Sequence, residues 1–391
     1  MKKLLLATAA TALMGSAATA EEIKLGVLLG FTGPLDSLAP AIAAGAEFAM
    51  AEVNDSGKMM DGITFAPVRG DSTCIDAGAA TASAERLITA DGVKGIVGAM
   101  CSGATGAVLQ NVAMPNGMVL ISPSATSPAL STVEDNGLFF RTAPSDARQG
   151  EVMANMLKER GYSNVAVTYT NNDYGKGLAD SFAAAWEAQG GTVTINAAHE
   201  DGKADYSAEV GALASAGGDL LVVAGYVDQG GSGIIQAALD SGAFDTFQLP
   251  DGMISSTLEE KFGTDIDGSF GQTPGSSAAE KFAEVVGDAF DATSTYADNG
   301  YDAAALIMLA MQAAGSTDPQ VYKDKIMDVA NAPGEQIFPG ELGKALEILA
   351  SGGEVDLVGA SAVELIGQGE SAGSYREIEM QDGKLVTIGY R

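Results

Sequence analysis

The sequence is poor in the side chains on which most catalytic and metal sites depend. Its 391 residues include one histidine, His199, and two cysteines, Cys74 and Cys101. A Ser–His–Asp triad needs a histidine as its base, and a zinc site draws its ligands mainly from Cys and His. His199 ends a run of strand character and precedes Glu200, so we expect a solvated loop histidine. The composition therefore argues against an enzyme, and we expect no metal and no cofactor.

Basic residues are also scarce. Lys and Arg number 21 against 51 Asp and Glu, which gives a formal net charge of −30. Such a chain is repelled by phosphate backbones and by anionic lipid, so nucleic-acid binding is excluded. The turn after the first expected strand, Gly30–Pro34, lacks the dinucleotide fingerprint, and no Gly-x-x-x-x-Gly-Lys-Ser/Thr loop occurs.

Long apolar runs are absent beyond the N-terminus. Residues 1–20 read as a cleaved signal peptide: Lys2 and Lys3 precede an apolar segment too short to span a bilayer, and Ala18–Ala20 offers small residues for cleavage. No later run approaches the ~18 apolar residues of a membrane span, and no cysteine near the cleavage site offers a lipid anchor. We expect a secreted, periplasmic protein that is not membrane-anchored.

The expected location bears on the two cysteines. In an oxidising compartment, Cys74 and Cys101 are expected to form a disulfide. Two buried free thiols are the alternative, and the spacing alone does not decide between them.

Strand-like and helix-like segments alternate along most of the chain. Ile23–Leu29, Ile63–Val68, Lys94–Met100 and Met118–Ile121 read as strands with helices between them, and a second such series begins after Phe139–Thr142. Residues 374–380 and 384–388 flank Asp382-Gly383 and read as an antiparallel hairpin. The alternation predicts an α/β fold of two doubly wound parallel-sheet lobes, with a boundary near residues 142–145.

Ligands of open α/β sheets lie beyond the carboxyl ends of the strands, so the turn after each expected strand is a candidate site. In the first lobe, Ser102 opens a helix, where a hydroxyl and free amides suit a carboxylate, although Ser102 could be an ordinary helix cap. The rigid turn Ser122–Pro128 carries four hydroxyls. It is either part of a binding site or a plain loop.

The equivalent turns of the second lobe carry aromatic and acidic residues. Tyr174 and Tyr226 each lie just after a strand, and Asp251 lies after another. Asp251 either caps a turn or pairs with a cationic group, because a buried ammonium needs a counter-charge. Hydroxyls on one lobe and Tyr and Asp on the other predict a ligand with a carboxylate and an ammonium.

These residues resemble those of the leucine/isoleucine/valine-binding proteins, the type I periplasmic binding proteins of ABC transporters. The resemblance runs over nearly all of the sequence after residue 20. It is carried by the order and spacing of several short motifs, which are IKLGVLLGFTGP at 23–34, Arg86-Leu87-Ile88, ISPSAT at 121–126, Phe140-Arg141-Thr142 and NDYG at 172–175.

The resemblance implies two lobes joined by a three-crossover hinge. The first would comprise residues 22–143 plus 274–359 and hold the ligand's carboxylate, and the second 144–273 plus 360–391 and hold its ammonium. A disulfide falls on Cys74 and Cys101. The implied ligand-binding residues are Ser102, Ser124, Thr126, Tyr174, Tyr226, Asp251 and Tyr296. Leu38 departs from the pattern, since several members carry an aromatic residue there. The resemblance therefore does not define the pocket for the ligand's side chain.

The function expected from this resemblance is transport. The chain would capture an α-amino acid, by default a branched-chain or other aliphatic one, and deliver it as a monomer to the transmembrane subunits of an ABC permease. The same role for an amide, urea or an aromatic carboxylate is the alternative within this class. A ligand-sensing protein that reports to a receptor is a second class, and a hydrolase or lyase acting in the same cleft is a third.

Overall fold

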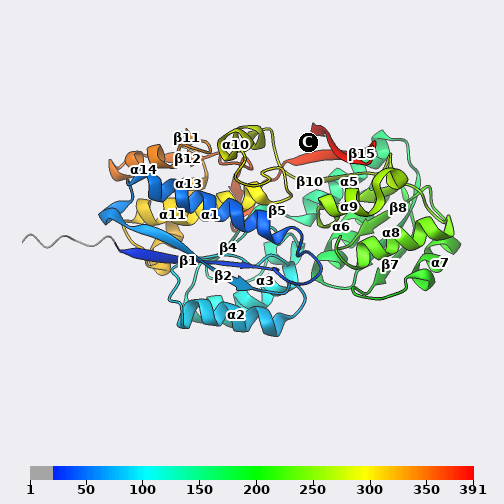
Figure 1. Cartoon of the computed structure of the whole chain (residues 1–391), viewed down its shortest axis with the longest axis horizontal. Coiled ribbons are helices and arrows are strands. Elements are labelled where there is room, and N and C mark those ends of the chain that lie inside the picture. The colour runs from blue at the N-terminus through cyan, green and yellow to red at the C-terminus, as the bar shows by residue number, and fades with distance from the viewer. Residues whose placement is uncertain (1–20) are drawn as a thin grey trace, which may run out of the picture.

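The computed structural model describes residues 21–391, and the signal-peptide prediction for residues 1–20 lies outside the described residues. Two α/β lobes lie side by side along the long axis of the molecule (Figure 1). Each lobe is built on a seven-stranded sheet with helices on its faces. The predicted fold class is therefore confirmed.

The first lobe is built on a sheet with the order β13-β14-β5-β4-β3-β1-β2, in which every pair except β13 and β14 is parallel. Buried apolar runs without alternation are typical of parallel strands covered on both faces. The strands are β1 (Glu22–Leu29), β2 (Thr64–Asp71), β3 (Ile96–Gly98), β4 (Leu120–Ser122), β5 (Phe139–Pro144), β13 (Leu365–Ile366) and β14 (Glu370–Ser371).

The second lobe repeats this plan with the order β16-β15-β10-β9-β8-β6-β7. Its parallel part is extended by the expected C-terminal hairpin, because β15 pairs antiparallel with both β10 and β16. The strands are β6 (Asn164–Thr170), β7 (Thr192–His199), β8 (Leu220–Ala224), β9 (Phe247–Leu249), β10 (Phe270–Pro274), β15 (Tyr375–Gln381) and β16 (Lys384–Tyr390).

Helices cover both faces of each sheet (Figure 1). Those of the first lobe are α1 (Ala39–Ser56), α2 (Ala77–Thr89), α3 (Ser102–Val108), α4 (Met114–Asn116), α10 (Ala278–Val286), α11 (Ala297–Ala314), α12 (Pro319–Tyr322), α13 (Ile326–Ala330) and α14 (Leu342–Ala350). Those of the second are α5 (Asp146–Glu159), α6 (Asp173–Ala188), α7 (Ser207–Ala216), α8 (Gly230–Ser241) and α9 (Ser256–Phe262).

The chain passes between the lobes three times. The passages lie between β5 and α5, after β10, and between β14 and β15. The predicted third boundary at residues 359–360 is wrong, because β14 pairs with β5 of the first sheet and so keeps residues up to Ser371 in the first lobe. Asp302 of α11 accepts backbone hydrogen bonds from Ala360 (2.7 Å) and Ser361 (2.8 Å), which fixes this part of the chain against the first lobe.

Helix α11 forms the centre of the first lobe and begins at the cleft. Its residues 297–312 are all buried. It crosses α1 at very short range, since a Cβ on Gly45 would lie 2.0 Å from the Ala297 carbonyl oxygen and a Cβ on Gly300 would lie 2.4 Å from that of Ile42. Only glycine allows such an approach of two backbones. The crossing therefore fixes the position of Tyr296, which precedes the helix.

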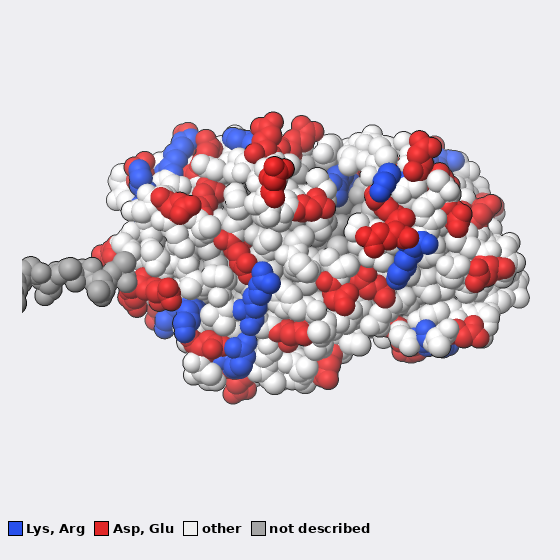
Figure 2. All heavy atoms as spheres, viewed as in Figure 1, with Lys and Arg blue, Asp and Glu red and all other residues white. Residues whose placement is uncertain are grey.

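Acidic side chains are spread over the visible face of both lobes, with fewer Lys and Arg among them (Figure 2). These side chains face solvent, so the excess of negative charge is dispersed over the surface. Among residues 21–391, no helix has the length and apolarity to cross a membrane.

His199 differs from its prediction. It is 1% exposed, hydrogen-bonds through Nδ1 to the Thr168 hydroxyl (2.8 Å), and meets the Tyr206 ring edge to face. Strand β7 continues to residue 199, and Tyr206 at the start of α7 packs over it, so the side chain is buried instead of lying in a solvated loop. Burial lowers the pKa of His199 to about 4.

We predict that His199 makes stability fall in mild acid. The unfolded imidazole takes up a proton below about pH 6.5, whereas the folded one does so only below about 4. Between these values the unfolded state binds more protons, so the free energy of unfolding decreases as the pH falls. Compared with His199→Gln, the wild type should lose up to about 3 kcal/mol more between pH 6.5 and 4 in denaturant titrations. Equal losses in both proteins would contradict this assignment.

Candidate functional site

The first lobe contributes a wall of small polar residues to the cleft. Ser102 lies after β3 and begins α3, directly after the Cys74–Cys101 disulfide, which confirms the predicted pairing. The Ser102 hydroxyl oxygen accepts a hydrogen bond from the Ser127 backbone N–H (3.1 Å). Ser102 therefore joins the start of α3 to the turn after β4.

That turn is held in place by its own hydroxyls. The Ser122 hydroxyl donates to the Ala99 carbonyl (2.5 Å) and accepts from the Ala125 N–H (2.9 Å). The Ser124 hydroxyl donates to the Met100 carbonyl (2.9 Å). Ser124 uses its hydroxyl proton in this contact, and its backbone N–H makes only a long hydrogen bond (3.4 Å) to the Ser122 hydroxyl oxygen. That N–H is the donor that Ser124 offers to a ligand.

Arg141 holds the same turn in place through hydrogen bonds to its backbone. Its guanidinium is 1% exposed and donates from Nη1 to the carbonyls of Ala125 and Ser127, both at 3.0 Å. Its Nη2 contacts the Glu370 carboxylate at 2.5 Å. A planar fork of donors suits two carbonyls and a carboxylate at once. The Phe140-Arg141-Thr142 motif thus shapes the loop that carries Thr126.

The second lobe contributes two stacked tyrosines and an acid. The rings of Tyr174 and Tyr226 lie parallel, with centroids 5.1 Å apart. Asp251 lies after β9 and is 3% exposed. Its Oδ1 accepts from the Tyr174 hydroxyl (3.0 Å) and from Gln149 Nε2 (2.8 Å).

Asp251 also reaches across to the first lobe, because its Oδ2 accepts a hydrogen bond from the Tyr296 hydroxyl. Tyr296 has φ = 68°, in the left-handed region that non-glycine residues seldom adopt, and it precedes α11. Burial raises the pKa of Asp251, while the hydrogen bonds from Tyr296, Gln149 and Tyr174 act in the opposite direction.

Asp146 is a candidate that sequence reasoning missed. It begins α5 immediately after the first passage between the lobes, is fully buried, and neither of its carboxylate oxygens has a hydrogen-bond partner among the described residues. Burial, and after it the nearby charge of Asp251, raises its pKa well above the usual range, while the neighbouring Thr126 hydroxyl and the charge of Arg141 act in the opposite direction. Like the other candidates, Asp146 lies just after a strand, β5, but nothing in the local sequence indicates that its side chain is buried.

Thr126 lies beside Asp146 and not in the centre of the cleft. Its carbonyl accepts the Asp146 backbone N–H (2.8 Å), and its hydroxyl is buried with no partner in the described part of the chain. The central cavity is lined by the other six predicted residues, by Leu35 and Met100, which add apolar surface, and by Cys101 and Gly252. Its volume is about 10 Å³, which is room for about one water molecule. A larger ligand therefore requires the lobes to separate.

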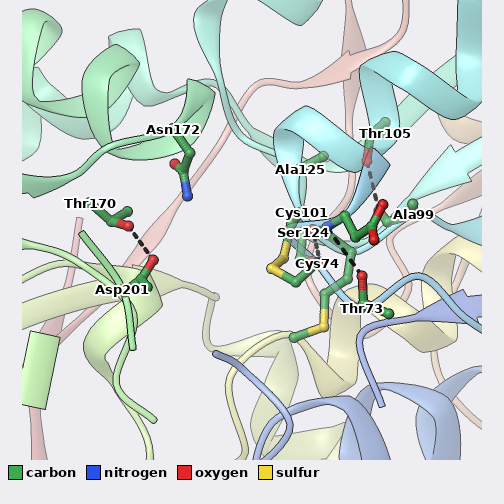
Figure 3. Close-up of a disulfide and its surroundings, with 12 residues drawn as sticks. Thr73, Cys74, Ala99, Cys101, Thr105, Ser124, Ala125, Thr170, Asn172 and Asp201 are labelled. Carbon is green, nitrogen blue, oxygen red and sulfur yellow. Dashed lines mark hydrogen bonds between the residues drawn. A yellow bond between two sulfur atoms is a disulfide. The ribbon is translucent and has the colours of Figure 1, made fainter. Parts of the chain in front are cut away.

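A side pocket of about 380 Å³ opens next to Tyr226. Figure 3 shows the Cys74–Cys101 disulfide of the first lobe on one side of it and Asn172, Thr170 and Asp201 of the second lobe on the other. The Thr170 hydroxyl donates to the Asp201 carboxylate, so this acid is already engaged.

The structure also bears on two other kinds of site, a serine-hydrolase triad and a metal centre. Residues 369–373 match Gly-x-Ser-x-Gly, but Ser371 lies in the two-residue strand β14 of the first lobe, whereas His199 is buried in the second. Within residues 21–391, no three His, Cys, Asp or Glu side chains are grouped so as to hold a metal ion.

The chain is similar to known proteins over most of its length. A family model described as "Periplasmic binding protein" matches residues 22–335. The Leu/Ile/Val-binding protein homolog 3 of Brucella melitensis is 31% identical over 331 residues, which cover 81% of this chain and 86% of that protein.

Two solved structures share the fold. A leucine-binding protein of Thermotoga maritima superposes with a TM-score of 0.79 at 22% identity, over 94% of this chain and 98% of its own. A solute-binding protein of an ABC transporter from Rhodopseudomonas palustris, in complex with p-hydroxybenzoic acid, gives a TM-score of 0.76 at 18% identity, over 95% and 97%. At these identities the likeness establishes the fold alone.

We predict that Arg141 cannot be replaced by lysine. The guanidinium reaches its partners from two separate nitrogens, Nη1 to the two carbonyls and Nη2 to the carboxylate, whereas the donors of a lysine ammonium all lie on one nitrogen. Arg141→Lys should therefore lower the free energy of unfolding by about 2–4 kcal/mol. Arg148→Lys is the matched control, because Arg148 is exposed and pairs only with Glu151 at 3.4 Å among the described residues, and it should change stability by less than about 0.5 kcal/mol. Similar losses for both variants in urea unfolding would refute the role given to Arg141.

Proposed function

We propose that this chain, which belongs to the periplasmic binding protein family, captures a free α-amino acid between its two lobes and delivers it to an ABC permease. The observation that carries the proposal is the pair of buried carboxylates, Asp146 and Asp251, at the lobe junction. Asp146 has no hydrogen-bond partner for either oxygen in the described chain. Burial raises the pKa of both carboxyls, and a cation beside them favours their ionised forms. An ammonium on the ligand is therefore the natural partner of this pair.

The opposite wall supports the carboxylate half of the ligand. Ser102, at the start of α3, presents its hydroxyl, and Ser124 presents its backbone N–H from a loop that Arg141 holds rigid. Thr126, on the same loop, adds a buried hydroxyl beside Asp146, outside the lining of the central cavity. Donors fixed in advance bind an anion without the cost of ordering them. A zwitterion that spans the cleft would satisfy both walls when the lobes close.

The apolar lining supports an aliphatic side chain. Leu35 and Met100 of the first lobe and the stacked Tyr174 and Tyr226 of the second enclose the cavity. Burial of a branched aliphatic group on these surfaces contributes about 25 cal/mol per Å². The relatives' names fit this chemistry, since the Brucella protein is called a Leu/Ile/Val-binding protein homolog.

The remaining parts of the proposal concern location and partners. Residues 1–20 have the features of a cleaved signal, which favours a periplasmic location. Ligand bridges the lobes, closure buries it, and the closed protein docks on the permease without chemical change to the ligand. In this role the protein is a carrier and not an enzyme, and it acts as a monomer.

An aromatic carboxylate is the second candidate. A structural neighbour holds p-hydroxybenzoic acid, and the Tyr174–Tyr226 stack could contact a ring. Such a ligand brings no cation to Asp146 and Asp251, which is why we place it second.

Thermal unfolding of ligand-free protein should distinguish these candidates. We expect leucine, isoleucine or valine to raise the midpoint by several degrees, since saturation at about 1,000 times the dissociation constant adds about 4 kcal/mol. The panel should include the other amino acids, urea, short amides and benzoates. A rise with benzoates alone would overturn the amino-acid proposal and keep the transport role.

We predict that Asp251→Asn weakens amino-acid binding at least about tenfold, because a charge-assisted hydrogen bond to the ammonium is lost. Calorimetric titration measures the affinity. Asp180→Asn is the control, since Asp180 is exposed and its ion pair is with Lys176 on the surface of α6, and it should leave the affinity unchanged. Normal binding by Asp251→Asn would rule out this carboxylate as the ammonium partner.

A further inference from the structure

The two lobes touch at one side of the cleft through a glycine. Gly177 lies inside α6 of the second lobe, with the turn that precedes η3 (Pro128–Ser131) of the first lobe in front of it. A Cβ at position 177 would lie 2.9 Å from Pro128 Cδ and 3.2 Å from Ser127 Oγ. The three atoms nearest to that Cβ all belong to the first lobe. The space at Gly177 is therefore limited by the other lobe and not by its own.

The opposing surface has little freedom to yield. Pro128 Cδ belongs to a ring bonded to the backbone nitrogen, so it cannot rotate away. The Ser127 N–H donates to Ser102 Oγ, and the Ser127 carbonyl accepts from Arg141. A shift of this turn would disturb the residues proposed to hold the ligand carboxylate.

Other contacts across the cleft are less tight. A Cβ on Gly103, in α3 of the first lobe, would lie 3.5 Å from Asp173 Oδ2, which is ordinary contact. Elsewhere between the lobes, the hydroxyls of Ser37 and Ser255 are 3.1 Å apart. Among these positions, Gly177 is where an added methyl group meets the other lobe below normal contact distance.

We propose that Gly177 is a positioning residue that sets how far the lobes close: the missing side chain lets α6 seat against the Ser127–Pro128 turn. An alanine at this position keeps the lobes apart and leaves each lobe folded. The fold of the second lobe should tolerate it, because alanine is a better helix former than glycine. The inference concerns closure alone and holds whichever ligand is bound.

Closure can be measured without a ligand through a disulfide across the cleft. In a Ser37→Cys, Ser255→Cys background the new thiols meet only when the lobes close, and the buried Cys74–Cys101 disulfide stays as an internal reference. The fraction crosslinked in a glutathione redox buffer reports the closed population. We expect Gly177→Ala to lower the crosslinking equilibrium about tenfold, the usual scale of one overpacked contact.

The matched control is Gly211→Ala. Gly211 also lies inside a helix of the second lobe, α7, and a Cβ there would meet nothing within 4 Å. This variant should crosslink like the parent. Removal of the opposing ring by Pro128→Ala should restore crosslinking to Gly177→Ala, which shows that the effect arises at the contact and not from misfolding.

Two results would overturn the inference. Gly177→Ala could crosslink as readily as Gly211→Ala, or Pro128→Ala could fail to rescue it. Neither result depends on which ligand is bound, because failure of the amino-acid proposal would appear in the thermal screen while the crosslinking comparison remained readable.

Discussion

A carboxylate buried at the junction of two lobes is the constraint around which this molecule is arranged. Asp251 accepts hydrogen bonds from Tyr174 and Gln149 of its own lobe and from Tyr296 of the other. Burying such a charge is costly unless its oxygens accept hydrogen bonds. Two tyrosine hydroxyls and one glutamine amide of the protein supply these hydrogen bonds. An incoming ammonium would compete with these donors for the same oxygens. The Asp251 carboxylate would therefore take part both in ligand binding and in the contact between the lobes.

The start of α11 links this carboxylate to the hinge. Tyr296 contacts Asp251, while Asn299, one turn further, exchanges hydrogen bonds with Thr142 at the first passage between the lobes (2.9 and 2.8 Å). The short crossing through Gly45 and Gly300 prevents α11 from sliding along α1. A movement of the second lobe about the hinge therefore changes the contact between Tyr296 and Asp251, where the ligand's cation would bind.

The sequence predicted the alternating α/β architecture, the disulfide and six residues that line one cavity, because each of these depends on local patterns or short motifs. It missed Asp146, whose role depends on burial against Asp251 across 105 positions of chain. It placed the third passage too early, since β13 and β14 have two residues each and carry no periodic signal. It mistook His199 for a loop residue, because packing against Tyr206 buries it. Tertiary contacts decided all three.

The central claim is that the two walls bind opposite charges of one ligand. Calorimetric titration of ligand-free protein with L-leucine, with isocaproate, which lacks the ammonium, and with isopentylamine, which lacks the carboxylate, tests it most directly. The account predicts binding of leucine and at least about hundredfold weaker binding of both analogues, because each leaves buried polar groups of one wall unpaired. Isocaproate binding as tightly as leucine would contradict it.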